Sequence, residues 1–153
     1  MKSMKHTSVL VAAGLLMSVL LAGCTQNNGH IGKLFGSWVL VERVAPGASP
    51  LPSDATFYMS FQGDVVQFIT EYEHYDYLRF FATWQRQGDR LTLNFDNKND
   101  NEAPGQGGFA PPQWLVNPSL HTTLMVTELD GGHLELADIS GSDEIIYKFD
   151  RTW

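Results

Sequence analysis

The chain reads Leu34-Phe35-Gly36-Ser37-Trp38-Val39-Leu40 where the first of eight short runs rich in β-branched and aromatic residues begins. Turn-forming residues separate these runs, and helical periodicity is rare among them, which predicts strands of an all-β domain. The eight predicted strands are Ser37–Val44, Thr56–Phe61, Val65–Tyr72, Tyr77–Arg86, Arg90–Asp96, Thr122–Leu129, His133–Ile139 and Glu144–Trp153.

Apolar and polar side chains alternate along these runs, so that each predicted strand has one apolar face. Phe57, Met59 and Phe61, for example, share a face. The pair Gly88-Asp89 suits the positive φ of a tight hairpin, so the strands on either side of it are expected to be adjacent and antiparallel. Eight strands with short turns avoid exposed edges most simply by closing. We therefore predict an all-β fold, an eight-stranded antiparallel up-and-down barrel, with a β-sandwich as the alternative.

The longest irregular stretch runs from Asn97 to Pro118. A loop of that length inside a small domain is more often functional or mobile than structural. Its apolar residues have three alternative roles: to plug one mouth of the barrel, to cover an exposed strand edge or to form a helical turn. These residues are Phe109, Trp114, Leu115 and Val116.

The opening Gly36-Ser37-Trp38 resembles the Gly-x-Trp motif of lipocalins, where a short turn precedes the first strand. In lipocalins an arginine from the last strand packs over that tryptophan and closes the base of the barrel. The resemblance implies that Arg151 lies over Trp38 in a cation–π contact worth roughly 0.5–2 kcal/mol. Gly36, Trp38 and Arg151 are thus expected to be structural, and the whole region is similar to the small lipocalin-like lipoproteins of bacterial envelopes.

The N-terminal segment has the three parts of an export signal: a basic start, an apolar core from Val9 to Leu21 and small residues behind it. The core is short for a membrane span, which needs about 20 apolar residues. Cys24, the only cysteine, follows directly, and Leu21-Ala22-Gly23-Cys24 resembles the lipobox at which bacterial lipoproteins are acylated and cleaved. A plain secretory signal is the alternative. We expect a lipoprotein signal peptide at residues 1–23, a lipidated tether at 24–30 and the barrel domain at 31–153.

Lipidation at Cys24 would make the membrane a partner of the mature chain without any hydrophobic helix, because two or three acyl chains hold a protein to a bilayer. Thr25 follows the cysteine, in place of the aspartate that resembles an inner-membrane retention signal in many Gram-negative lipoproteins. The linker from Thr25 to Gly29 also has no acidic cluster. In some bacterial groups such a cluster resembles a signal for export to the cell surface. We therefore expect a location in the cell envelope, at the outer membrane and facing the periplasm.

Cleavage after Gly23 would remove 23 of the 153 residues and leave 130, the size of one domain. It would also remove Lys2 and Lys5 and lower the net charge from −7 to −9. An acidic domain repels nucleic acid and anionic lipid headgroups, so neither is expected as a partner. With Cys24 acylated, no thiol remains for disulfides or catalysis.

No motif in the sequence indicates catalysis or metal binding. The histidines of the mature chain are widely spaced, and the acidic corner of Glu71, Glu73 and Asp76 around His74 is better explained as a solvated rim than as a calcium or hydrolase site. There is no nucleophile elbow, phosphate loop or dinucleotide fingerprint. We expect no catalytic residues, no cofactor, no bound metal and no enzymatic activity.

Two functions remain open on the sequence alone. In the first, the barrel holds a small apolar ligand or lipid, which requires a cavity of about 300 Å³ or more; Tyr72, Phe80 and Trp84 are the candidate ligand-binding residues at an open end. In the second, side chains fill the barrel, and its outer surface or the Asn97 to Pro118 loop binds or inhibits an envelope protein.

Overall fold

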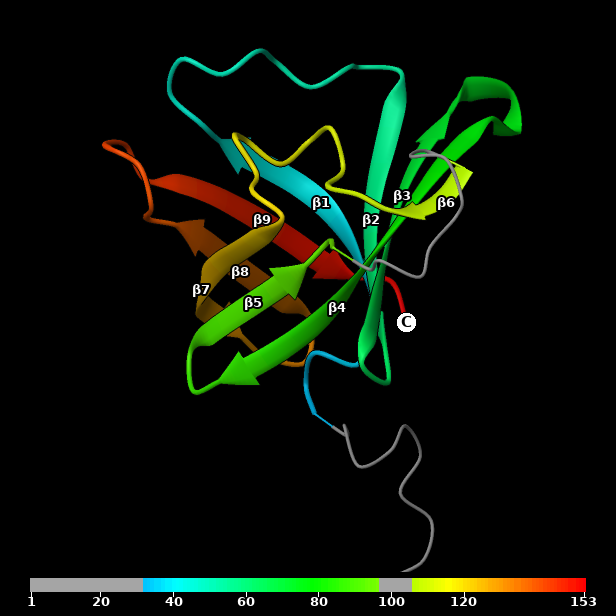
Figure 1. Cartoon of the computed structure of the whole chain (residues 1–153). Coiled ribbons are helices and arrows are strands. Elements are labelled where there is room, and N and C mark those ends of the chain that lie inside the picture. Colours follow the sequence, from blue (N-terminus) through cyan, green and yellow to red (C-terminus); the bar gives the residue numbers. More distant parts are fainter. Residues whose placement is uncertain (1–31, 97–105) are drawn as a thin grey trace, which may run out of the picture. The chain divides into compact units, whose positions relative to one another are not determined.

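Nine strands run through residues 32–96 and 106–153, which are the residues that this computed structural model describes (Figure 1). The predicted signal peptide at 1–23 and the predicted tether with Cys24 lie outside the described residues, as does the 97–105 part of the long loop. The strands are β1 (Gly36–Val44), β2 (Ala55–Gln62), β3 (Val65–Tyr72), β4 (Tyr77–Gln87), β5 (Arg90–Asn94), β6 (Gln106–Phe109), β7 (His121–Leu129), β8 (His133–Asp138) and β9 (Ile145–Arg151), with a short 3₁₀ turn at Glu73–Tyr75.

Eight of these strands close into a barrel. The order of neighbours is β3-β2-β1-β9-β8-β7-β5-β4, and β3 pairs again with β4 from Val65–Thr83 to Glu71–Tyr77, which joins the two ends of the sheet. All pairings within this ring are antiparallel. The predicted eight-stranded antiparallel up-and-down barrel is therefore confirmed, and the β-sandwich alternative is wrong.

The ninth strand, β6, is an addition that the sequence did not predict. The predicted fifth strand ends two residues early, at Asn94, which pairs with Thr83. The part of β4 that precedes Thr83 consequently has no antiparallel neighbour on that side. There β6 pairs with β4 in parallel, and the rings of Phe81 and Phe109 lie 6.1 Å apart. The strand thus covers a free sheet edge, which is a common way to prevent pairing with other chains.

The barrel interior is filled by apolar side chains from all eight ring strands. Each side chain of this size contributes about 1.5–3 kcal/mol when it is fully buried. The fully buried set includes Trp38, Met59, Phe61, Phe68, Leu91, Leu93, Leu124, Leu134, Tyr147 and Phe149. The alternation in the sequence thus points the apolar face of every ring strand inward, and these buried side chains form one core cluster.

Candidate functional site

The base of the barrel is formed by Gly36, Trp38 and Arg151. Trp38 is fully buried, and the guanidinium carbon of Arg151 lies 4.5 Å from the centroid of its ring. The indole Nε1 of Trp38 donates a hydrogen bond of 2.9 Å to the Leu34 carbonyl, and Arg151 donates to the Lys33 carbonyl. The structure thus brings together the aromatic ring and the cation that the lipocalin resemblance pairs.

Gly36 allows the chain ends to meet at this base. Its φ is +127°, and a Cβ on this residue would lie 2.5 Å from the backbone oxygen of Trp153. The same oxygen accepts a hydrogen bond from the Ser37 amide at 3.3 Å, and the Thr152 amide donates to the Ser37 carbonyl at 2.8 Å. The last residues are therefore fixed against the first strand, and this end of the barrel is closed.

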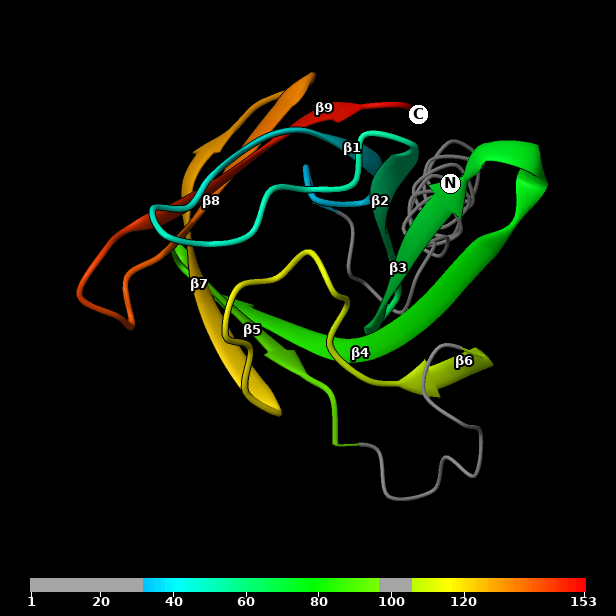
Figure 2. The same ribbon diagram turned by 90° about the horizontal axis from the view of Figure 1, so that it is seen from above.

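At the opposite end, residues 110–118 turn inward and form what we call the plug segment (Figure 2). Its central residue, Trp114, is 1% exposed. The Trp114 ring packs edge-on against Phe68, Tyr147 and Phe149, at centroid distances of 5.8, 5.6 and 5.8 Å. Of the three roles considered for the long loop, two are therefore realised by different parts of it: β6 covers an edge and Trp114 plugs the mouth.

Two hydrogen bonds hold the plug segment to the barrel wall. The Val116 amide donates to the Tyr147 hydroxyl at 3.0 Å, and Arg43 Nη1 donates to the Trp114 carbonyl at 3.0 Å. Arg43 also donates to the Ser49 carbonyl in the β1–β2 loop. Burial raises the pKa of the Tyr147 phenol, so its hydroxyl stays protonated and neutral in this position. One guanidinium thus joins the two segments that border the mouth.

A β-bulge in β1 directs Arg43 toward the inside. The register between β1 and β9 shifts between Leu40 and Glu42, so that Leu40 pairs with Phe149 and Arg43 pairs with Tyr147. Both β9 partners are buried in the core. Because paired residues of antiparallel strands share a face, Arg43 lies on the inner face, and Val41 is the extra residue, 56% exposed.

A pocket of about 430 Å³ lies between the plug segment and the β1–β2 loop. Arg43 is the only charged residue among the described residues that line it. Trp114 is also in the wall, and its buried indole N–H has no hydrogen-bond partner among residues 32–96 and 106–153. The lining is Arg43, Pro46–Pro52, Phe57, Tyr72 and Gln113–Asn117.

The three candidate ligand-binding residues are not brought together. Tyr72 lines the mouth pocket. Phe80 is 6% exposed in the core, where it pairs with Phe68, and it does not line the pocket. Trp84 lies toward the base, since its ring is 5.1 Å from that of Phe61, which pairs with Gly36. Sequence reasoning missed Arg43, because strict alternation from Trp38 would place Glu42 inside and Arg43 outside.

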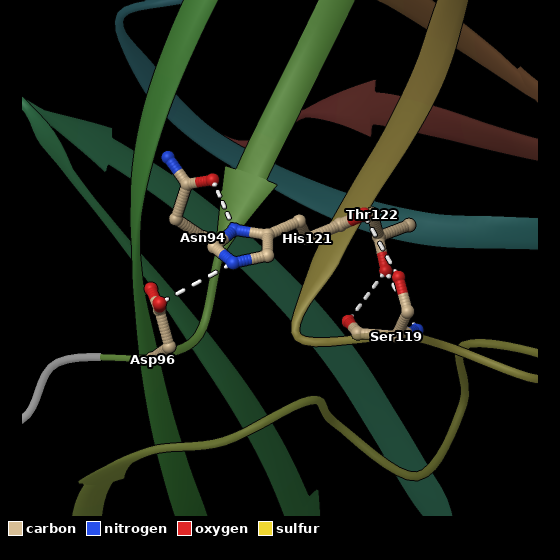
Figure 3. Close-up of polar contacts among 5 residues, drawn as sticks. All are labelled: Asn94, Asp96, Ser119, His121 and Thr122. Carbon is tan, nitrogen blue, oxygen red and sulfur yellow. Dashed lines mark hydrogen bonds and ion pairs between the residues drawn. The ribbon is translucent and has the colours of Figure 1, made fainter.

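His121 forms a polar cluster where β5 ends and β7 begins (Figure 3). Its Nδ1 is 3.0 Å from Asn94 Oδ1, and its Nε2 is 3.3 Å from Asp96 Oδ2. Ser119 is close by, but its hydroxyl donates to the backbone carbonyl of His121 at 2.8 Å rather than to the imidazole. In a catalytic triad the nucleophile is hydrogen-bonded to its base, so the Ser119 and His121 side chains do not form one here. The cluster instead ties together the two ends of the long loop.

The acidic corner that the sequence singled out contains the 3₁₀ turn Glu73–Tyr75, with His74 at φ 70°. The Glu71 side chain lies next to the Tyr58 hydroxyl; burial and then this carboxylate raise the pKa of the Tyr58 phenol. In the described ranges 32–96 and 106–153, no three or more His, Cys, Asp or Glu side chains are grouped closely enough to hold a metal ion. No helix within these ranges is long and apolar enough to span a bilayer.

Comparisons with known proteins agree with this architecture. The lipocalin-like domain family matches residues 19–151. A lipocalin-like protein from Bacteroides uniformis superposes with a TM-score of 0.55 at 18% identity, over 78% of this chain and 99% of the other. An uncharacterized protein from Bacteroides eggerthii superposes with a TM-score of 0.51 at 16% identity, over 77% of this chain and 98% of the other. The comparison with curated proteins gives no match. Because the family match covers most of the sequence, the chain belongs to the lipocalin-like domain family.

Proposed function

We propose that this protein is a lipid-anchored envelope protein that binds a small amphipathic ligand in the mouth pocket. The observation that carries the binding proposal is the pocket itself, whose volume of about 430 Å³ falls within the range of about 300–1,000 Å³ for small-molecule sites. The anchor rests on the lipobox-like sequence at Cys24, and the envelope location on the export signal before it.

The lining supports a ligand with an apolar body and an oxygen-rich, anionic end. Phe57, Leu115 and the Trp114 ring supply apolar surface. Arg43 is a cation in an otherwise acidic protein, and a buried indole N–H without an acceptor costs about 1–3 kcal/mol until one is supplied. The buried side chains of the core support a ligand position at the mouth, so we propose the mouth pocket in place of deep burial inside the barrel.

Decanoate and decanol are suitable probes because they differ only in the charged end. We expect decanoate to bind more tightly than decanol and to shift the NMR signals of Tyr72 and the Trp114 indole. Arg43→Gln should abolish the preference for the carboxylate, whereas Arg43→Lys should retain part of it, since the charge is kept. Equal affinity for both probes in the native protein, or no shift at either residue, would rule out the anionic site.

The anchor is tested separately by cell fractionation. Cys24→Ser removes the only sulfur that can be acylated, and the variant should move from the membrane to the soluble envelope fraction. Retention of the variant in the membrane fraction would contradict lipid anchoring at this residue.

The packed interior favours one alternative, a module that binds or inhibits an envelope protein through its outer surface. A pulldown from detergent-solubilised envelopes tests it, with the native chain as bait. Specific enrichment of one envelope protein, retained by the Arg43→Gln variant, would favour this alternative over ligand binding in the pocket.

A further inference from the structure

The base of the barrel carries an exposed and a half-buried aromatic residue, Trp153 and Phe35, close to Gly32, where the described part of the chain begins. Trp153 is 59% exposed, and its ring meets that of Phe35 edge-on at 6.1 Å. The Ser37 amide donates a hydrogen bond to the backbone oxygen of Trp153, which keeps this residue at the base. Tryptophan is enriched at membrane interfaces, where its ring contacts lipid and its N–H stays in contact with water.

The proposed tether is short, so it would keep the base of the barrel close to the bilayer and bring these two aromatic residues near the lipid surface. Eight peptide units join Cys24 to Gly32, and a fully extended chain of that length spans at most about 28 Å. Gly32 lies next to the base, because its carbonyl accepts a hydrogen bond of 3.0 Å from the Phe35 amide. Strand β1 alone has nine residues and is about 30 Å long, so a tether of this length cannot readily bring the mouth to the same membrane.

We propose that the base docks on the lipid surface through Trp153 and Phe35, with the mouth pocket facing away from the bilayer. This inference rests on the proposed lipid anchor at Cys24. It implies that the pocket takes its ligand from the aqueous envelope space rather than directly out of the membrane.

Charge does not drive this docking. Three backbone hydrogen bonds place acidic turns at the base end. In each, an amide donates to a turn carbonyl: Trp84 to Asp64, Val126 to Asp89 and Arg151 to Gly132. Asp64, Asp89 and Asp130 are exposed there, together with the basic residues Lys33, Arg86 and Arg90. Because both signs are present, we expect docking on zwitterionic lipid and no strengthening when anionic lipid is added.

The full acylated chain, labelled with 5-fluorotryptophan and placed in phosphatidylcholine nanodiscs, provides the test by ¹⁹F NMR. Its four tryptophans give four probes, assigned by Trp→Phe variants, with Trp114 at the mouth as the internal control. A nitroxide on the lipid acyl chains should abolish the Trp153 signal and leave that of Trp114 intact. A water-soluble paramagnet should broaden Trp153 in detergent but not in nanodiscs.

A Trp153 signal that stays sharp beside the lipid nitroxide and stays accessible to the aqueous reagent would overturn the docking. A signal shielded from both reagents would indicate contact with protein and would also overturn it. The mass spectrum of the same sample separates the two proposals. An acylated chain with an undocked Trp153 refutes only the docking, whereas a chain without acyl groups refutes the anchor and the docking with it.

Discussion

At the scale of single residues, the closure of the barrel depends on the absence of a side chain at position 36. Gly36→Ala would place a Cβ 2.5 Å from the Trp153 carbonyl at a φ of +127°, so backbone must move before the base can close. Gly88→Ala is the matched control, because Gly88 also has a positive φ, +60°, but nothing lies within 4 Å of its Cβ position. The control should lose about 1–2 kcal/mol of unfolding free energy from backbone strain alone.

We expect Gly36→Ala to lose clearly more stability than Gly88→Ala in urea unfolding. It should also weaken the protection of the Thr152 amide from hydrogen exchange, because that amide donates to Ser37 at the base. Equal losses of unfolding free energy in the two variants would show that the close approach of the Trp153 backbone does not add to the effect of Gly36→Ala.

The pair His133 and Asp150 gives a pH-dependent contribution at the residue scale. His133 Nδ1 lies 2.9 Å from Asp150 Oδ1, and this hydrogen bond, followed by the charge of Asp130, raises the pKa of His133 above 6.5. A raised pKa means that the folded state binds the proton more tightly. The added stability is therefore complete below about pH 6.5 and is lost as the pH rises through the folded-state pKa.

Asp150→Asn should accordingly bring the pKa of His133 down toward its ordinary value of 6.5, as followed by NMR titration of the imidazole. Asp143→Asn, which removes a carboxylate from the β8–β9 turn, is the control and should leave that pKa unchanged. An unchanged titration of His133 in Asp150→Asn would contradict the contact.

Residue patterns predicted some of these features and not others. The resemblance of Gly36-Ser37-Trp38 to the Gly-x-Trp motif of lipocalins implied the pairing of Trp38 with Arg151. The inward orientation of Arg43 could not be predicted, because it depends on a β-bulge that the residue types of Leu40–Glu42 do not specify. Of the three candidate ligand-binding residues, Tyr72 lines the mouth pocket, and its role in binding stays a prediction.

At the scale of elements, the bulge in β1 decides which side chains enter the pocket. Deleting Val41 should leave Leu40 opposite Phe149 and Arg43 opposite Tyr147 in a regular ladder, so the fold and the position of Arg43 should survive. Deleting Val39 instead reverses the alternation between Trp38 and Leu40, which cannot then both face the core.

The two deletions are compared by thermal unfolding and by the NMR signal of the Trp38 indole, which donates to Leu34. The Val41 deletion should melt within several degrees of the native protein and keep that signal in place. The Val39 deletion should be unfolded or lose the signal. Comparable damage from both deletions would mean that the extra residue is itself required for the barrel.

The plug segment is the second element that shapes the site. Trp114→Ala removes a fully buried indole that contacts three aromatic rings, which costs about 3–5 kcal/mol of unfolding free energy. The Val116 amide, which donates to Tyr147, should also exchange its hydrogen faster. Gln113→Ala changes an exposed neighbour and should do neither. An unchanged exchange rate at Val116 in Trp114→Ala would show that the indole does not hold the segment.

The sequence left the role of this element open for a physical reason. Apolar residues in an irregular loop show that the loop is buried somewhere, but they do not show against what. The choice among plug, edge cover and helical turn depends on the free edge of β4 and on the space above Phe68, and both arise only when the barrel has closed.

At the scale of the whole molecule, the fold was predictable and the site was not. Alternation, turn residues and strand number act locally and favour a closed sheet, and the pairing of β3 with β4 decides for the barrel over the sandwich. The pocket lies where β1, the β1–β2 loop and the plug segment meet, and these are far apart in sequence. The proposed anchor and the proposed docking of the base would together hold the mouth pocket away from a membrane at a fixed orientation.

Native mass spectrometry of the full chain, purified from the membrane fraction, tests the lipid anchor and the bound ligand in one measurement. Under native conditions we predict a chain that begins at Cys24, carries acyl groups and retains one small ligand. Under denaturing conditions the ligand should be lost and the acyl mass should remain, and Arg43→Gln should reduce the ligand-bound fraction without changing the acyl mass. A chain with an unmodified Cys24, or an acylated chain that retains no small molecule, would contradict the account.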